Sequence, residues 1–113
     1  MLPKEKRVNR AIFKDILEKS KTFHSSYFSL RCFDSRKTEK SRFSFVVSKK
    51  VENKATKRNI LKRRGYNSIK PIYKNIKPGF YCVFFLKKEA RGLKSKDFEG
   101  EMGYLLKKAG VLI

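Results

Sequence analysis

The chain has 113 residues, enough for one domain with a modest core and too few for two, so we expect a single domain over residues 1–113. Hydrophobic residues make up 40% of it and include ten Phe and five Tyr, which argues against a disordered tail. Thirty Lys and Arg against ten Asp and Glu give a net charge of +20 at pH 7, and a compact domain tolerates such self-repulsion best when its partner is a polyanion.

The first predicted element is a helix over about residues 9–19. Ile12, Phe13, Ile16 and Leu17 fall at i, i+1, i+4 and i+5, and so form one apolar stripe. Asn9, just before this stripe, is the predicted N-cap. We therefore expect an amphipathic helix that packs on a core along one side.

Two strands with alternating polarity follow, in "SYFSLRCF" (26–33) and "RFSFVVSK" (42–49). The predicted apolar face consists of Phe28, Leu30, Cys32, Phe43, Phe45 and Val47. The predicted polar face consists of Tyr27, Ser29, Arg31, Arg42, Ser44, Val46 and Ser48, and need not be covered by protein. A further short strand fits residues 20–26 or 34–41, and the sequence does not decide between them.

The most basic segment is "SKKVENKATKRNILKRRGYNSI", residues 48–69. Eight of the sixteen residues from Lys49 to Arg64 are Lys or Arg. A surface that is only solvated would interleave charges of both signs, but Glu52 is the one acidic residue between positions 40 and 88. Asn53 is the predicted N-cap of a helix that ends near residue 68 or 69, because Pro71 disfavours helical geometry before it.

A helical wheel gives this segment a narrow packing face of Leu61, Gly65, Ser68 and Ile69. Arg58, Lys62 and Tyr66 line up on a second face, and Lys57 and Arg64 define a further side. Basic groups on two sides suit a helix that lies between two nucleic-acid elements.

The remaining elements complete a small α+β fold. "PIYKNIKPG" is expected to add one more turn before Pro78 and Gly79 break the chain, and the apolar "FYCVFFL" (80–86) is typical of a strand buried on both faces. "KKEARG" is a predicted loop, and Ser95 is the predicted N-cap of a last helix that ends at Gly110. The order helix, strand, strand, (strand), helix, strand, helix predicts an α/β sandwich.

The sequence shows no signal peptide, membrane span, metal site or catalytic constellation. The N-terminus lacks an apolar run, and no stretch approaches the roughly 20 apolar residues of a membrane span. Cys32 and Cys82 lie in strand patterns that favour buried, reduced thiols, and His24 is the only histidine. The acidic residues are scattered, so a protein-borne nuclease site is not expected. We expect a cytoplasmic protein.

The segment "FSFVVSKKVENKATKRNILKRRGYNSI" resembles the signature of the bacterial ribonuclease P protein subunit. In that signature a "VSKK"-type strand end leads through a short loop into a basic helix that begins Arg-Asn-Arg. The similarity extends over nearly the whole chain, and includes the first helix, the alternating strands, the apolar strand ending in two Lys and the final helix.

The resemblance implies a division of labour within a ribonucleoprotein. An RNA subunit holds the catalytic centre and removes the 5′ leader of precursor tRNA with Mg²⁺ that the RNA mainly holds. The protein binds that RNA through the basic helix, and holds the leader in a cleft between the first helix and the open sheet face. It also implies a left-handed crossover around the basic helix, contrary to the usual rule.

Two sets of residues follow from matching this sequence to the family. The predicted leader-binding residues are Phe13, Leu17, Arg31, Val46, Arg58, Lys62 and Tyr66. The predicted contacts to the catalytic RNA are Lys49, Lys50, Lys57, Asn59, Arg63 and Arg64. For Phe13 and Leu17 core packing is the alternative, and for the second set it is nonspecific charge.

The sequence departs from the family pattern at several positions. The Arg-Asn-Arg motif reads Arg58-Asn59-Ile60 here, and Arg64, one turn on, is a candidate to replace the missing charge. Gly65 marks either a close approach of the helix to the sheet or a weaker helix, at a cost of roughly 0.5–1 kcal/mol relative to Ala.

Two departures concern the leader-binding set, where Tyr66 offers a stacking ring in place of a common basic residue, and Leu17 replaces a second Phe. A ribosomal protein or another small basic RNA-binding module is the alternative function.

Overall fold

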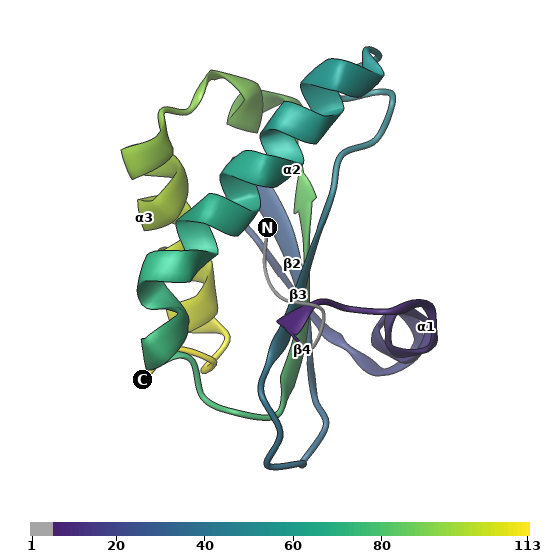
Figure 1. Cartoon of the computed structure of the whole chain (residues 1–113), viewed down its shortest axis with the longest axis vertical. Helices are drawn as coiled ribbons and strands as arrows, with labels where there is room; N and C mark the ends of the chain where they lie inside the picture. The colour runs from purple at the N-terminus through teal and green to yellow at the C-terminus, as the bar shows by residue number, and fades with distance from the viewer. Residues whose placement is uncertain (1–5) are drawn as a thin grey trace.

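The computed structural model describes residues 6–113 and shows a four-stranded sheet with helices on both faces (Figure 1). The elements in chain order are α1 (Arg10–Lys19), β1 (Lys21–His24), β2 (Phe28–Asp34), β3 (Arg42–Val46), α2 (Ala55–Ile69), the 3₁₀ helix η2 (Lys70–Asn75), β4 (Phe80–Leu86), the 3₁₀ helix η3 (Lys88–Gly92) and α3 (Ser95–Lys108). The predicted α+β sandwich is confirmed. The further short strand, which the sequence placed in either of two segments, is β1 and lies within residues 20–26.

The sheet has the order β1-β2-β4-β3. β2 pairs with β1 and β4 in antiparallel fashion, whereas β3 and β4 are parallel and are joined through α2. This parallel unit is the crossover that the family resemblance implies, and its left hand stays a prediction. β4 is an inner strand between β2 and β3, and most of its apolar run is buried, as predicted.

The main core lies between the sheet and the two helices α2 and α3. The apolar face predicted from alternation is confirmed, because its residues in β2 and β3 are all buried in this core. Four phenylalanine rings are fully or almost fully buried in contact with one another: Phe28 with Phe84 and Phe98, and Phe45 stacked on Phe84 at 5.4 Å between ring centroids. The packing of these buried rings holds α2 and α3 against the sheet.

Gly65 lies where α2 comes closest to the sheet. A Cβ added at this residue would lie 2.5 Å from the ring of Phe45, much closer than van der Waals contact allows. Of the two interpretations of Gly65, the structure supports close approach.

The opposite sheet face is covered in part by α1. A second, smaller apolar cluster centres on Ile16 of α1 with Tyr81 and Val83 of β4. Asn9 caps α1 as predicted, because its side-chain oxygen accepts a hydrogen bond from the Ile12 N–H at 2.9 Å. From the sequence, this polar face did not need to be covered by protein. In the structure, α1 covers the part formed by β2 and β4.

Two predicted caps and one predicted loop are wrong. The N-cap of α2 is Lys54 rather than Asn53, and that of α3 is Lys94 rather than Ser95; neither makes a side-chain capping bond. In front of α2, Arg58 instead binds the carbonyl oxygens of Glu52 and Asn53 and so holds the loop. "KKEARG" is the short helix η3, since it closes 3₁₀-type hydrogen bonds.

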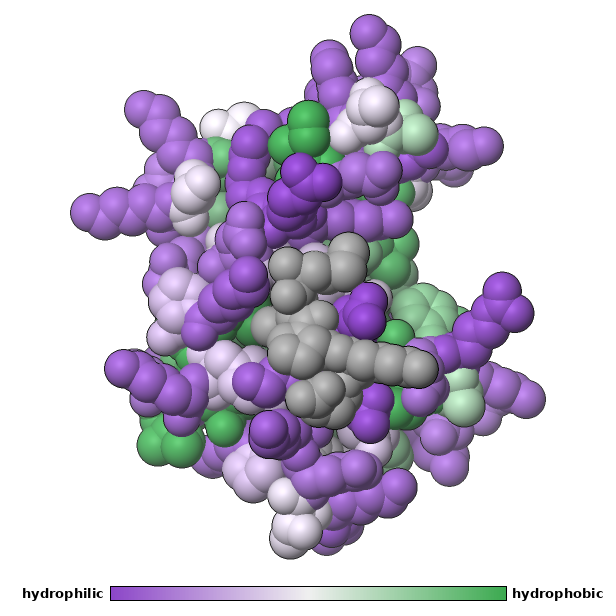
Figure 2. All heavy atoms as spheres, viewed as in Figure 1, coloured by the Kyte–Doolittle hydropathy of each residue, from purple (hydrophilic) through white to green (hydrophobic). Residues whose placement is uncertain are grey.

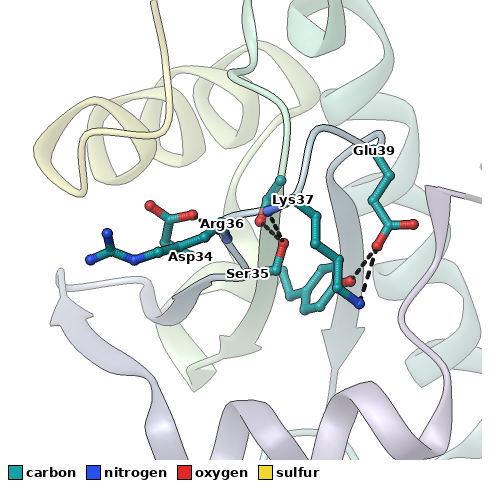
Figure 3. Close-up of polar contacts among 7 residues, drawn as sticks. Asp34, Ser35, Arg36, Lys37 and Glu39 are labelled. Carbon is teal, nitrogen blue, oxygen red and sulfur yellow. Dashed lines mark hydrogen bonds and ion pairs between the residues drawn. The ribbon is translucent and has the colours of Figure 1, made fainter.

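The connection between β2 and β3 folds against the start of β4 (Figure 3). Asp34 accepts the N–H of Arg36, whose φ of 59° turns the chain, and Ser35 donates its hydroxyl to the Gly79 carbonyl. Glu39 accepts the Tyr81 hydroxyl, and burial together with this bond raises the pKa of Tyr81. Polar bonds to β4 thus replace the strand that residues 34–41 were one candidate to form.

Candidate nucleic-acid interface

The edge strand β3 separates two helices that lie on opposite sides of the sheet. Figure 1 shows the sheet nearly edge-on, with α1 on one side and α2 on the other. α1 packs on β2 and β4, and α2 packs on β3. The α1-facing side chains of β3, which are Arg42, Ser44 and Val46, are therefore only partly buried. An open strip runs between the two helices.

Two adjoining hollows follow this strip. One of about 470 Å³ is lined by Ser44, Phe45, Asn59, Lys62, Arg63 and Tyr66. The other, of about 360 Å³, is lined by Arg7, Val8, Asn9, Arg42 and Tyr66. They share Tyr66, and the described residues that line them include several cationic side chains and no carboxylate. The arrangement suits a negatively charged chain that lies along β3.

Four of the predicted leader-binding residues lie on the α1 side of the sheet. Phe13 and Val46 pack in the smaller apolar cluster and are partly exposed, and Leu17 is 47% exposed. Arg31 donates from Nη1 to the Leu17 carbonyl at 3.3 Å, with its guanidinium 5.9 Å from the centre of the Phe85 ring. The structure thus joins these residues from α1, β2 and β3 on one surface.

The other three predicted leader-binding residues, all on α2, have different environments. Lys62 faces the hollow beside β3, as expected. Arg58 lies partly buried against the loop before α2, since both of its bonded carbonyls come from that loop. Tyr66 was predicted to share the face of Arg58 and Lys62, apart from the packing face of α2, but it is buried in the core. It is 8% exposed, because its ring packs edge-on against Phe45, so only its rim reaches the hollows.

The predicted catalytic-RNA contacts surround α2 and its approach. Lys49 and Lys50 are exposed in the turn after β3, and Lys57, Asn59 and Arg63 are exposed on the helix. Arg64 is anchored, because its Nη1 donates to the Leu93 carbonyl at 3.0 Å. Among residues 6–113 no carboxylate lies within ion-pair distance of the basic members of this set. In Figure 2 hydrophilic residues dominate the surface over α2.

The side of α2 that faces away from β3 carries Ile60, where the family motif has its third basic residue. Ile60 is 52% exposed and lines two further hollows, of about 480 and 250 Å³. Arg64 lines both as well, so its position agrees with the proposal that it replaces the missing charge. Lys96 of α3 lines the larger of these hollows together with Glu99, and Arg91 of η3 lines the smaller one, 4.0 Å from the carboxylate of Glu52.

Arg42, Arg91 and Lys96 were not among the predicted site residues. Arg42 donates to the Arg7 carbonyl at 3.1 Å, while its Nε is buried without a hydrogen-bond partner. Its alternation with Ser44 and Val46 was a signal that could have identified it. For Arg91 and Lys96 no local signal exists, because folding alone brings η3 and α3 beside α2.

Within residues 6–113 no three His, Cys, Asp or Glu side chains gather in a way that could hold a metal ion. No described helix is long and apolar enough to cross a membrane.

Known proteins of one family have sequences similar to this chain. The ribonuclease P family model matches residues 2–110. A "Ribonuclease P protein component" from a Synechocystis strain is 33% identical over 98% of this chain and 90% of its own length. One from Clostridium novyi is 30% identical over 97% of this chain and 98% of its own length.

Solved structures show the same fold. The RNase P protein of Staphylococcus aureus superimposes with a TM-score of 0.84 at 22% identity, over 97% of this chain and 100% of that one. The RNase P protein of Thermotoga maritima superimposes with a TM-score of 0.80 at 26% identity, over 90% of this chain and 96% of that one. With the family model matching almost the entire sequence, the chain belongs to the ribonuclease P protein family.

Proposed function

We propose that this protein binds the ribonuclease P RNA through α2 and the turn before it, and holds the 5′ leader of precursor tRNA along β3. One observation carries the proposal: the strip of β3 between α1 and α2 is open and is lined by cationic side chains without a carboxylate among the described residues. Single-stranded nucleic acid is held by such a basic groove together with apolar or aromatic surfaces. Phe13, Leu17 and Val46 supply that apolar surface beside the groove.

The two basic sides of α2 suggest a division between the two RNAs. Lys62 faces the β3 hollow and is assigned to the leader, together with Arg31 and the loop-bound Arg58. Lys57 and Arg64 face the other side and are assigned to the catalytic RNA. Asn59 and Arg63 line the hollow beside Lys62, so the proposal places them where the two RNAs meet. Lys49 and Lys50 extend the catalytic-RNA contact to the turn before α2.

The proposal leaves the cleavage chemistry to the RNA subunit. Phosphodiester hydrolysis by a protein requires an acid–base pair or clustered carboxylates that hold metal ions. Since the described residues offer no such cluster, we assign Mg²⁺ to the RNA. The protein contributes binding and positioning of the precursor, and a cytoplasmic location follows from this role.

The test is the affinity of the reconstituted holoenzyme for precursor and mature tRNA. Phe13→Ala should weaken precursor binding by roughly tenfold, because base–aromatic stacking is worth about 1–3 kcal/mol. Binding of mature tRNA, which lacks the leader, should stay nearly unchanged. Equal losses for both RNAs would show that Phe13 has no leader role.

A matched control separates recognition from stability. Phe33 is also partly buried in the smaller cluster but lies outside the proposed leader set. Phe33→Ala should lower the melting temperature by an amount similar to Phe13→Ala, with equal effects on the two tRNAs. If Phe33→Ala also discriminates between them, the leader effect of Phe13 is only a consequence of instability.

A further inference from the structure

The sheet brings the two cysteines of the chain together. Cys32 in β2 is the direct partner of Cys82 in β4, and their sulfur atoms are 3.4 Å apart. Both are free thiols; Cys82 is fully buried and Cys32 is 7% exposed. They lie in the core under α2 and α3, and the proposed RNA surface does not use them.

The hydrogen bonds at the two ends of the β2–β4 ladder identify the type of this pair. Partners in an antiparallel ladder alternate between hydrogen-bonded and non-hydrogen-bonded pairs. The Lys87 N–H donates to the Tyr27 carbonyl beyond one end, and the Ser35 N–H donates to the Gly79 carbonyl beyond the other, both at 2.9 Å. The register between them is continuous. Odd-numbered residues of β2 therefore form the hydrogen-bonded pairs, and Cys32 belongs to a non-hydrogen-bonded pair.

This pair type places the backbone within reach of a disulfide. In non-hydrogen-bonded pairs the Cα atoms are about 4.5 Å apart and the side chains are closest. Disulfides span Cα separations of roughly 4.4–6.8 Å with an S–S bond of about 2.0 Å. The two sulfur atoms need to approach by about 1.4 Å, which rotation of the side chains supplies without a change of register.

A small oxidant can reach Cys32 but not Cys82. Cys32 lines a surface hollow of about 490 Å³, together with the side chains of Lys21, Phe23 and Phe80. Burial raises the pKa of Cys82 well above its usual value, and the bond to Cys32 adds to this, so the Cys82 sulfur stays protonated. Oxidation therefore begins at Cys32, because Cys32 lines the hollow and Cys82 does not.

We infer that Cys32 and Cys82 form a reversible oxidation site whose co-substrate is a hydroperoxide. The Cys32 thiolate attacks one oxygen of H₂O₂ and becomes a sulfenic acid as the O–O bond breaks. The hydroxide that leaves takes up a proton to give the first water. The Cys82 sulfur then attacks the Cys32 sulfur, and its proton leaves with the hydroxyl group as a second water. Two thiols and one peroxide thus give one disulfide and two waters, with two electrons passing to the peroxide.

The crosslink stabilises the fold and leaves RNA binding intact. It joins residues 50 positions apart, so it restricts the unfolded chain and should raise the melting temperature by about 10 °C. Phe13 and Val46 of the proposed leader surface lie on the opposite face of the sheet, and Lys62 lies on α2 in a hollow beside β3 that neither cysteine lines. The oxidised protein should therefore bind precursor tRNA within about twofold of the reduced protein.

The experiment is intact-mass analysis of the full chain, in its native state, after exposure to H₂O₂. The expected product is a monomer that has lost two hydrogen masses, resists alkylation and regains both thiols with dithiothreitol. Addition of oxygen without loss of the two hydrogens, or a covalent dimer, would overturn the inference. This measurement uses the unmodified sequence, so it stays decisive even where a cysteine variant folds poorly.

Two comparisons tie the disulfide to the native pairing. Peroxide should raise the melting temperature of the unmodified protein but not that of Cys32→Ser or Cys82→Ser. The disulfide should also form at least tenfold faster in the native protein than in guanidinium-denatured chain. Equal rates would show that the sheet does not prepare the pair, and would overturn the inference while leaving the proposed RNA function intact.

Discussion

The two faces of the sheet are built from neighbouring residues of the same strands but have different environments. The face under α2 and α3 is dry: Phe28, Phe43, Phe84 and Phe98 are fully buried there. The face under α1 carries Ser29, Arg31, Ser44 and Val46, all partly exposed. The covered face stabilises the molecule, and the half-covered face leaves side chains available to a partner. Within the sheet, the residues that stabilise the fold and the residues proposed to bind RNA thus lie on different faces.

The largest effect should come from neighbouring residues of β4 that point to opposite faces. Phe84 is fully buried between Phe28 and Phe45, so Phe84→Ala should lower the free energy of unfolding by about 3–5 kcal/mol. Phe85 is partly exposed beside Arg31, and Phe85→Ala should lose less than half as much. Denaturant unfolding of both variants measures the difference. Equal losses would mean that the two faces do not differ in packing.

A smaller effect should come from the closeness of α2 to the covered face. Gly65→Ala should destabilise the protein by about 1–3 kcal/mol, since the added methyl group meets the Phe45 ring and overpacks the core. Gly103→Ala in α3 is the matched control. Apart from its chain neighbours and the backbone of its own helix turn, nothing lies within 4 Å of its added Cβ, so this change should stabilise by about 0.5–1 kcal/mol. A stabilising Gly65→Ala would contradict the tight contact.

The smallest effect concerns charge on the recognition side. Arg63→Ala should lower the slope of log affinity for the RNA subunit against log salt by about 1, because one phosphate contact is lost. Lys21→Ala removes an exposed charge at the opposite edge of the sheet and should leave the slope unchanged. Binding curves at several salt concentrations measure both slopes. If both changes lower the slope equally, RNA binding depends on the net charge of the protein and not on a specific contact with α2.

The helix caps and the α2 wheel mark where reasoning from sequence failed. The caps at Asn53 and Ser95 were each predicted one residue away from the observed position. A polar side chain near a helix start is only a statistical signal for a cap. The start of α2 also depends on the bonds of Arg58 to the preceding loop, which the sequence does not reveal. The wheel assigned Tyr66 to the face of Arg58 and Lys62 by its spacing, apart from the packing face. The nearby Phe45 ring turns it inward instead, and a wheel contains no information about such a neighbour.

The sequence alone determined the local features of this protein. Alternation assigned the two faces of β2 and β3, the apolar run identified β4 as a buried strand, Asn9 capped α1, and the excess of Lys and Arg indicated an RNA partner. These follow from interactions between residues a few positions apart. The tertiary structure decided the insertion of β4 between β2 and β3, and with it the Cys32–Cys82 pair and the open strip along β3. Such contacts join distant segments, and they depend on how whole elements pack rather than on any local pattern.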